Sequence, residues 1–400
     1  MILFLHHRYR MTGGEERGVA DLMWLVREWL GEDAELIARD SSGLSRHVAG
    51  AGLLAGGLHP ETFARAVRRT RARIVHAHNV HQTFGWRALS AARSAGARVV
   101  LHLHQYRMVC AIGVCFRDGT ECMRCHGRNT LPGIALNCRG SRAEALAYGA
   151  GLAVWQRRLA AHVDAFVVPS RFAGVRLAEL GAPIRAPLVV PHVVRETENA
   201  GMIAAGPVAP DPGVSSENPD GHHPGAPFAL VVGRLTPEKG IDVAIDACGR
   251  LGLDLVVAGD GPERERLAAR AAADRPPAAG RAARAVRFLG AVAPAELAAL
   301  RRRAVIGLMP SRSAETFGLA AAEAMAAGLP MVASRIGALP ELVPEQWLAA
   351  PGDPGALAET IERVCADPSA PARAREAARA TCAPEVVAPA LRAAYEHATG

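Results

Sequence analysis

Short apolar runs alternate along the chain with longer stretches in which apolar residues recur at helical spacing. Runs of four to six apolar residues between glycine, proline or polar turns are typical of strands buried on both faces of a parallel sheet. They predict strands over 1–5, 35–38, 74–77, 99–104, 165–168 and 188–190, and then over 229–232, 253–258, 286–289, 305–309 and 331–333. The helical stretches between them indicate βαβ units. We therefore expect an α/β protein with two Rossmann-like parallel-sheet domains.

A proline- and glycine-rich stretch separates the two sets of strands. Residues 201–227 include six prolines and five glycines and show no apolar periodicity, which predicts a flexible linker. A chain of 400 residues is also longer than one hydrophobic core usually spans. The predicted organisation is a first domain over 1–200, the linker over 201–227, a second domain over 228–383 and a terminal helix over 384–400.

The composition is that of a globular protein, with 50% hydrophobic and 21% charged residues. No apolar run approaches the roughly 18 residues of a membrane span. The opening MILFLHH lacks the basic flank and long apolar stretch of a signal peptide and predicts a strand instead. We expect a cytoplasmic protein whose eight cysteines are reduced or bound to metal.

Charge is distributed unevenly between the two halves. Residues 1–200 contain 26 Arg against 16 Asp and Glu, a net charge of +10, whereas residues 201–400 have a net charge of −3. A basic first half favours an acidic partner, such as an anionic membrane surface, a phosphorylated substrate or nucleic acid, although a solvated arginine-rich surface explains it equally well. Among the 46 basic residues only Lys239 is a lysine, which suggests a position that needs a compact ammonium group.

Several candidate binding residues of the second half follow predicted strands, at the edge where parallel sheets bind ligands. Gly233 and Arg234 come directly after strand 229–232, and Lys239 lies where the next helix is expected to open. Two cations at a strand end suit a nucleotide diphosphate. Gly261, in a Gly-Asp-Gly turn after strand 253–258, and Phe288 in strand 286–289 belong to the same edge.

Two glutamates, Glu315 and Glu323, stand eight residues apart where the strand over 305–309 leads into a helix. We expect that helix to begin at about Thr316, with Glu323 about two turns along it. Its N-terminus offers free N–H groups and a positive dipole end, which favour a phosphate group. Because two carboxylates would repel a phosphate, they are better suited to bind sugar hydroxyls.

These motifs resemble those of the family 4 retaining glycosyltransferases of the GT-B fold, over nearly the whole chain. The family signature is Glu-x7-Glu with Phe-Gly after the first Glu, preceded by Arg-x4-Lys. The resemblance implies two Rossmann-like domains that face a central cleft, with a C-terminal helix that crosses back to the first, acceptor-binding domain. It also implies transfer of a hexosyl group from a nucleotide-diphosphate sugar to a hydroxyl acceptor, with retention of configuration.

The resemblance assigns roles to individual residues. Arg234 and Lys239 would neutralise the donor pyrophosphate, and Glu323 would bind the ribose hydroxyls. The donor sugar would be held by Glu315 and by the backbone amides of Phe317, Gly318 and Leu319.

In the first half, Gly13 and Gly14 resemble the family's glycine loop, which lets the backbone approach the donor. His104 matches the family histidine near the reacting centre, and Gln105 stands where many members have Asp. A buried structural histidine is the alternative for His104, and equally for His76 and His78.

Five of the eight cysteines lie between Cys110 and Cys138, within a segment over 106–140 that we expect to be an insertion. Cys122 and Cys125 form a Cys-x-x-Cys pair, and with Cys110 and Cys138 they have the spacing of a structural zinc site. Cys115 and His126 are alternative ligands. A disulfide or redox pair and unliganded thiols remain open, and some members of the family have a similar cysteine-rich insertion.

No Asp-x-Asp stands at a suitable strand end, so we expect no catalytic metal. The expected partners are a UDP- or GDP-sugar and a hydroxyl acceptor, in polysaccharide, glycolipid or natural-product glycoside synthesis. A lipid-linked acceptor would suit peripheral contact with the inner face of an anionic membrane. The alternatives are an epimerase or phosphorylase of the same fold, pyridoxal phosphate on Lys239, and a zinc-containing nucleic-acid-binding protein, which the 4% aromatic content disfavours.

Overall fold

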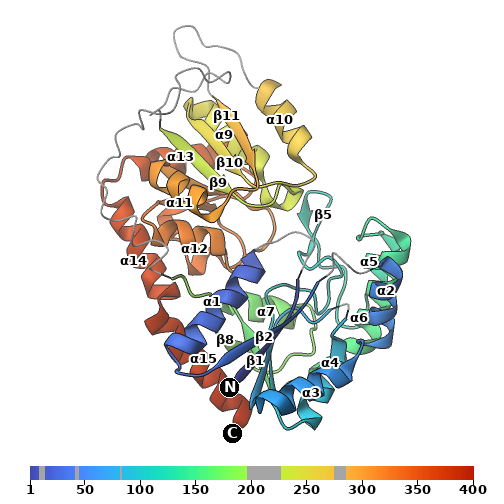
Figure 1. Ribbon diagram of the computed structural model, residues 1–400. Helices are drawn as coiled ribbons and strands as arrows, with labels where there is room; N and C mark the ends of the chain where they lie inside the picture. Colours follow the sequence, from blue (N-terminus) through green and yellow to red (C-terminus); the bar gives the residue numbers. More distant parts are fainter. Residues whose placement is uncertain (9–13, 41–44, 82, 196–226, 274–284) are drawn as a thin grey trace. The chain divides into compact units, whose positions relative to one another are not determined.

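The computed structural model describes residues 1–8, 14–40, 45–81, 83–195, 227–273 and 285–400 (Figure 1). The chain forms two compact units, Met1–Val193 with Cys382–Gly400, and Val194–Thr381. Except for its last residue, the linker predicted over 201–227 lies outside the described residues. No helix in the described ranges is long and apolar enough to cross a membrane.

The first unit is built on a six-stranded parallel sheet of order β2-β1-β3-β4-β7-β8. Its strands are β1 (Ile2–Arg8), β2 (Ala34–Asp40), β3 (Ile74–Ala77), β4 (Arg98–His102), β7 (Ala165–Val168) and β8 (Leu188–Val189). Successive side chains of a strand point to opposite faces. In β1, Leu3 and Leu5 therefore enter one core, while Ile2 and Phe4 enter the core on the other face.

Helices cover both faces of this sheet. The helices of the unit are α1 (Gly14–Glu28), α2 (Arg46–Ala55), α3 (Pro60–Thr70), α4 (Gly85–Ser94), α5 (Leu131–Ala135), α6 (Arg142–Ala160), α7 (Arg171–Glu179) and α15 (Pro384–Thr399). The C-terminal helix α15 packs beside α1 on the face that includes Phe4, and contributes Val387, Leu391 and Tyr395 to that core. The last residues of the chain thus complete the core that its first strand begins.

The cysteine-rich segment includes a small antiparallel hairpin of β5 (Phe116–Arg117) and β6 (Thr120–Glu121), followed by α5. The sequence pattern predicted neither strand, because two residues are too few to show a period.

The second unit has a six-stranded parallel sheet of order β11-β10-β9-β12-β13-β14. Its strands are β9 (Phe228–Val232), β10 (Asp254–Ala258), β11 (Val286–Gly290), β12 (Ile306–Met309), β13 (Met331–Ser334) and β14 (Leu348–Ala349). Its helices are α9 (Ile241–Leu251), α10 (Arg264–Ala273), α11 (Pro294–Arg303), α12 (Leu319–Ala326), α13 (Pro354–Cys365) and α14 (Ala370–Cys382), with short 3₁₀ turns at Pro237–Lys239, Leu339–Glu341 and Glu345–Trp347.

The predicted fold class is confirmed, since both units are Rossmann-like α/β domains on parallel sheets. Two strand ends differ from the prediction in an informative way. Strand β1 continues through His6 and His7, both only 1% exposed, because these polar residues are buried rather than turned to solvent. Strand β4 instead ends at His102, before the predicted His104.

Candidate functional site

The candidate site of the second unit lies where the order of its strands reverses. From β9 the chain proceeds to β10 and β11 on one side, and then returns to β12, which pairs with the other side of β9. The loops that follow β9 and β12 therefore lie next to each other at the carboxyl edge of the sheet. Such a switch point is where open α/β sheets bind their ligands.

Close backbone contact joins these two loops. Gly240 has a φ of 64°, and a Cβ atom there would lie 2.0 Å from the carbonyl oxygen of Pro310. The backbone N–H of Arg312 donates to the carbonyl of Glu238 at 2.8 Å, and its guanidinium donates to Asp242 at 2.9 Å. These contacts hold the loop that includes Arg234 and Lys239 next to the loop that includes Glu315.

Lys239 and Glu315 form the central pair of the site. The Nζ atom of Lys239 donates to Oε1 of Glu315 at 2.7 Å, and the hydroxyl of Ser311 donates to the same oxygen at 2.6 Å. Burial alone would raise the pKa of Glu315, but Lys239, Ser311 and Arg234 together hold that pKa below its usual value. The carboxylate is thus ionised at neutral pH and neutralises the ammonium group beside it.

Lys239 belongs to a 3₁₀ turn, Pro237–Lys239, rather than to the start of an α-helix, which corrects the prediction. The α-helix α9 begins only at Ile241, because Gly240 before it adopts the left-handed conformation. Arg234, half-exposed, lies in the same loop with a guanidinium nitrogen 3.6 Å from Glu238.

Helix α12 begins at Leu319 and not at about Thr316 as predicted, because Gly318 adopts a φ of 104° that interrupts the helical backbone. A Cβ atom at Gly318 would lie 2.7 Å from Leu339, so the turn requires glycine. The helix has no side-chain N-cap, and its first N–H groups lie just after Glu315 and the buried Phe317. Glu323 is consequently the fifth residue of α12 rather than two turns along it.

Glu323 is paired with Arg301 of helix α11, and these residues are 8% and 7% exposed. Arg301 was not predicted from the sequence, because it begins an Arg-Arg-Arg run at a helix end, and such a run is typical of a solvated surface. The ribose-binding role of Glu323 remains a prediction. The structure also pairs its carboxylate with a buried cation, Arg301.

The remaining predicted donor-binding residues of this unit lie along the same sheet. A Cβ atom at Gly261 would lie 2.4 Å from the carbonyl oxygen of Leu235, so the turn after β10 packs tightly on the loop after β9. Gly233, the residue directly after β9, donates its N–H to the carbonyl of Ala258 in β10 at 3.0 Å. Phe288 lies on the edge strand β11, and its carbonyl accepts a hydrogen bond from Arg264 at 3.1 Å.

In the first unit, Gly14 is the first residue of α1, and Gly13 lies outside the described residues. His104 follows β4, is 8% exposed, and has its Nε2 atom 2.7 Å from Nδ1 of His78. Burial and neighbouring histidines hold the pKa of His104 well below its usual value, so the ring is neutral. The side-chain amide of Gln105 donates to the carboxylate of Glu15 at 3.0 Å. This bond joins α1, the helix after the predicted glycine loop, to the segment that follows β4.

The cysteine-rich segment brings its five thiols around one pocket, lined by Cys110, Cys115, Cys122, Cys125 and Cys138 together with Arg117. A hydrogen bond from Cys115 lowers the pKa of Cys110 to about 6, whereas burial raises the pKa of Cys125 to about 11. Arg117 donates to Sγ of Cys138 at 3.5 Å. The ring of His126, the other alternative ligand, lies against Gly181.

Each half of the chain matches a protein-family model. Residues 13–192 match the glycosyl transferase 4-like domain, and residues 216–381 match the glycosyl transferases group 1 model. Glycogen synthase of Mycobacterium tuberculosis is 41% identical over 158 residues, which are 38% of this chain and 36% of that enzyme. D-inositol 3-phosphate glycosyltransferase of Mycobacterium bovis is 38% identical over 179 residues, 42% of this chain and 37% of the relative. The matches thus span little more than a third of the length of these curated relatives.

Solved structures share the fold over the whole length of the chain. Sucrose-phosphate synthase from Thermosynechococcus elongatus has a TM-score of 0.68 at 19% identity, covering 99% of this chain and 98% of its own. Anabaena HepE, solved in complex with UDP and glucose, has a TM-score of 0.62 at 16% identity, covering 99% of both chains. The chain thus has the GT-B fold, and its two halves match the glycosyl transferase 4-like model and the glycosyl transferases group 1 model in that order.

Proposed function

We propose that this protein transfers a hexosyl group from a nucleotide-diphosphate sugar to a hydroxyl acceptor, with retention of anomeric configuration. The observation that supports this function most is the arrangement of Lys239, Glu315 and Arg234 at the strand-order switch of the second unit, beside the N-terminus of α12. Relatives named as glycosyltransferases, and a neighbour solved with UDP-glucose, agree with a nucleotide-sugar donor.

The charges of this site suit a leaving nucleoside diphosphate. In the reaction the bond between the anomeric carbon and the diphosphate oxygen breaks, and its electron pair remains on the diphosphate. Arg234, Lys239 and the free N–H groups of α12 would stabilise that charge, as preorganised donors do in other transfer reactions. No step in this scheme requires a catalytic metal.

Glu315 would accept hydrogen bonds from the hydroxyls of the donor sugar, because its carboxylate is kept ionised by Lys239 and Ser311. The amides of Phe317, Gly318 and Leu319 lie at the turn that follows, and Glu323 would hold the ribose. Retention follows if the acceptor hydroxyl attacks from the face that the diphosphate leaves, with its proton passing to the departing oxygen. His104, which is neutral and nearly buried just after β4, would act near the reacting carbon of the donor sugar, the role that the family resemblance implies.

The acceptor would be a hydroxyl of a growing polysaccharide, a glycolipid or a natural product. The net charge of +10 over residues 1–200 favours a lipid-linked acceptor at an anionic membrane surface, at the cytoplasmic face.

The test is incubation with UDP- or GDP-hexoses and a panel of hydroxyl acceptors, with released nucleotide and product configuration followed by NMR. Release that depends on the acceptor, with the anomeric configuration unchanged, is the expected result. Conversion of the donor sugar to an isomer without acceptor would instead identify an epimerase. A requirement for inorganic phosphate as co-substrate would identify a phosphorylase.

We further propose that Cys110, Cys122, Cys125 and Cys138 hold a structural Zn²⁺ ion, since they line one pocket and thiolates prefer this metal. The Cys122→Ser variant should lose one equivalent of zinc and melt at a lower temperature than the wild type, whereas Cys365→Ser, at an exposed helix end, should lose neither. Metal analysis of protein purified under reducing conditions checks this. Zinc-free wild-type protein would refute the site.

A further inference from the structure

Histidine occupies alternate positions at the carboxyl ends of three neighbouring strands in the first unit. His6 lies on β1, His76 and His78 lie on or just after β3, and His102 ends β4. Alternate residues of a strand share a face, so these side chains lie on the face where Phe4 and Tyr395 belong to the apolar core. Histidines thus occupy positions that would ordinarily hold apolar side chains.

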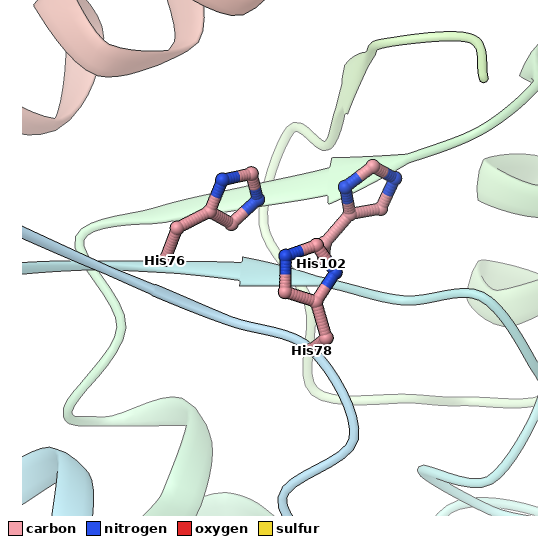
Figure 2. A group of neighbouring side chains, drawn as sticks. All are labelled: His76, His78 and His102. Carbon is pink, nitrogen blue, oxygen red and sulfur yellow. The ribbon is translucent and has the colours of Figure 1, made fainter. Parts of the chain in front are cut away.

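Three of these rings lie together in a stacked group, with interplanar angles of 6°, 26° and 29°. The ligand nitrogens of His76, His78 and His102 lie within 4.8 Å of one another, and Figure 2 shows the three rings arranged around the space between them. Their exposed fractions are 0%, 3% and 1%, respectively. The group is therefore shielded from bulk solvent.

The hydrogen bonds of the cluster leave its inner nitrogens unsatisfied. Nδ1 of His76 lies 2.8 Å from the hydroxyl of Tyr395, and Nδ1 of His78 lies 2.7 Å from Nε2 of His104. The Nε2 atoms of both rings, and both nitrogens of His102, have no hydrogen-bond partner among the described residues. Buried polar atoms without partners are costly and rare in folded proteins, so a ligand that would satisfy several of them at once is expected.

From this geometry we infer that His76, His78 and His102 bind one divalent transition-metal ion of the Zn²⁺ class. Imidazole nitrogen is a preferred ligand of Zn²⁺, Co²⁺, Ni²⁺ and Cu²⁺, whereas Mg²⁺ and Ca²⁺ prefer oxygen. The site is separate from the cysteine pocket, which none of these histidines lines.

The outer hydrogen bonds are those that a metal-binding histidine needs. A ligating imidazole typically donates its second ring N–H to a neighbouring acceptor, which fixes the tautomer and the orientation of the ring. If Nδ1 of His76 donates to Tyr395, and Nδ1 of His78 donates to His104, both Nε2 lone pairs are left for the metal.

Metal binding requires the stacked rings, whose centroids lie 4.4 to 5.5 Å apart, to turn until their nitrogens face one ion. Zn–N bonds of about 2.0–2.1 Å in tetrahedral geometry hold the ligand nitrogens about 3.4 Å apart. The observed spacing of up to 4.8 Å would therefore contract by at most about 1.4 Å, which side-chain rotation can provide. The fourth position would be taken by water or a small ligand.

The test compares zinc bound by the wild type and by His102→Leu after removal of metal with a chelator, re-equilibration with Zn²⁺ and gel filtration. Because leucine suits the apolar face, the variant should fold and bind one equivalent less zinc than the wild type. The matched control is His162→Leu, which removes a half-buried imidazole stacked on Trp86 in the same unit and should bind as much zinc as the wild type. Equal zinc in His102→Leu and the wild type would overturn the proposal.

A second measurement needs no variant and remains decisive if His102→Leu does not fold. X-ray absorption at the zinc edge of the loaded wild-type protein distinguishes imidazole nitrogen from thiolate sulfur. The expected result is scattering from about three imidazoles for the ion bound by the histidines. Sulfur scattering from an ion in the cysteine pocket would add to it. A spectrum of sulfur ligands alone would overturn the proposal.

Discussion

Replacing Lys239 by alanine should lower the rate of sugar transfer by about a hundredfold or more, the usual cost of removing one preorganised donor from a developing charge. Two effects add in this variant. The proposed donor diphosphate would lose a cation at the strand-order switch, and the carboxylate of Glu315 loses the ammonium group 2.7 Å away. Steady-state kinetics with the preferred donor measures the loss. Lys239→Arg should recover little, because a planar guanidinium does not replace a compact ammonium bonded to one carboxylate oxygen.

The matched control for Lys239 is Arg270→Ala, which removes another paired cation of the second unit. Arg270 is bonded to Asp246 at 2.6 Å between exposed side chains on α10 and α9, away from the two loops of the site. Its loss should leave the transfer rate within a factor of about two. Full activity in Lys239→Ala, or an equal loss in Arg270→Ala, would remove the assignment of Lys239 to the donor diphosphate.

Replacing Arg301 by alanine should destabilise the protein by about 3–5 kcal/mol, because it breaks the buried ion pair with the carboxylate of Glu323. Both partners are less than one tenth exposed, so little water can compensate the lost charge. For a domain of this size the melting temperature should fall by roughly 10 °C. Calorimetry or circular dichroism against temperature measures the change.

Two variants separate this charge effect from loss of packing. Arg335→Ala breaks an exposed pair with Glu345 and should cost less than about 1 kcal/mol, as surface pairs do. Adding Glu323→Gln to Arg301→Ala removes the buried negative charge and should restore part of the lost stability. If Arg301→Ala were as stable as Arg335→Ala, the buried pair would not be important for folding.

The sequence predicted the fold well because its strands are buried on both faces, so their apolar runs are continuous. The runs at Ile74–Ala77 and Ala165–Val168 have the predicted bounds. Strand β1 was predicted too short because burial of His6 and His7 depends on neighbouring strands, which a local pattern does not reveal. The two-residue strand β14 was missed, since two residues show no periodicity.

Only part of the site was predicted, because contacts between segments far apart in the chain leave no local pattern. Lys239 and Glu315 were singled out from the chain alone, and the structure joins them by a hydrogen bond across 76 residues of sequence. Arg301 was missed because its partner lies on another helix, and an arginine run is ordinarily solvated. The convergence of His76, His78 and His102 depends on the pairing of β3 with β4, which sequence spacing does not encode.

The most direct test of the proposed donor site is the thermal stability of the protein against a panel of UDP-, GDP-, TDP- and ADP-sugars. At a hundred times Kd, a bound donor adds about 2.7 kcal/mol of stability, a shift that is readily measured. We predict a shift with one class of nucleotide, which Lys239→Ala greatly reduces and Arg270→Ala retains. If none of the nucleotide sugars shifted the melting temperature, the proposed donor site would be contradicted.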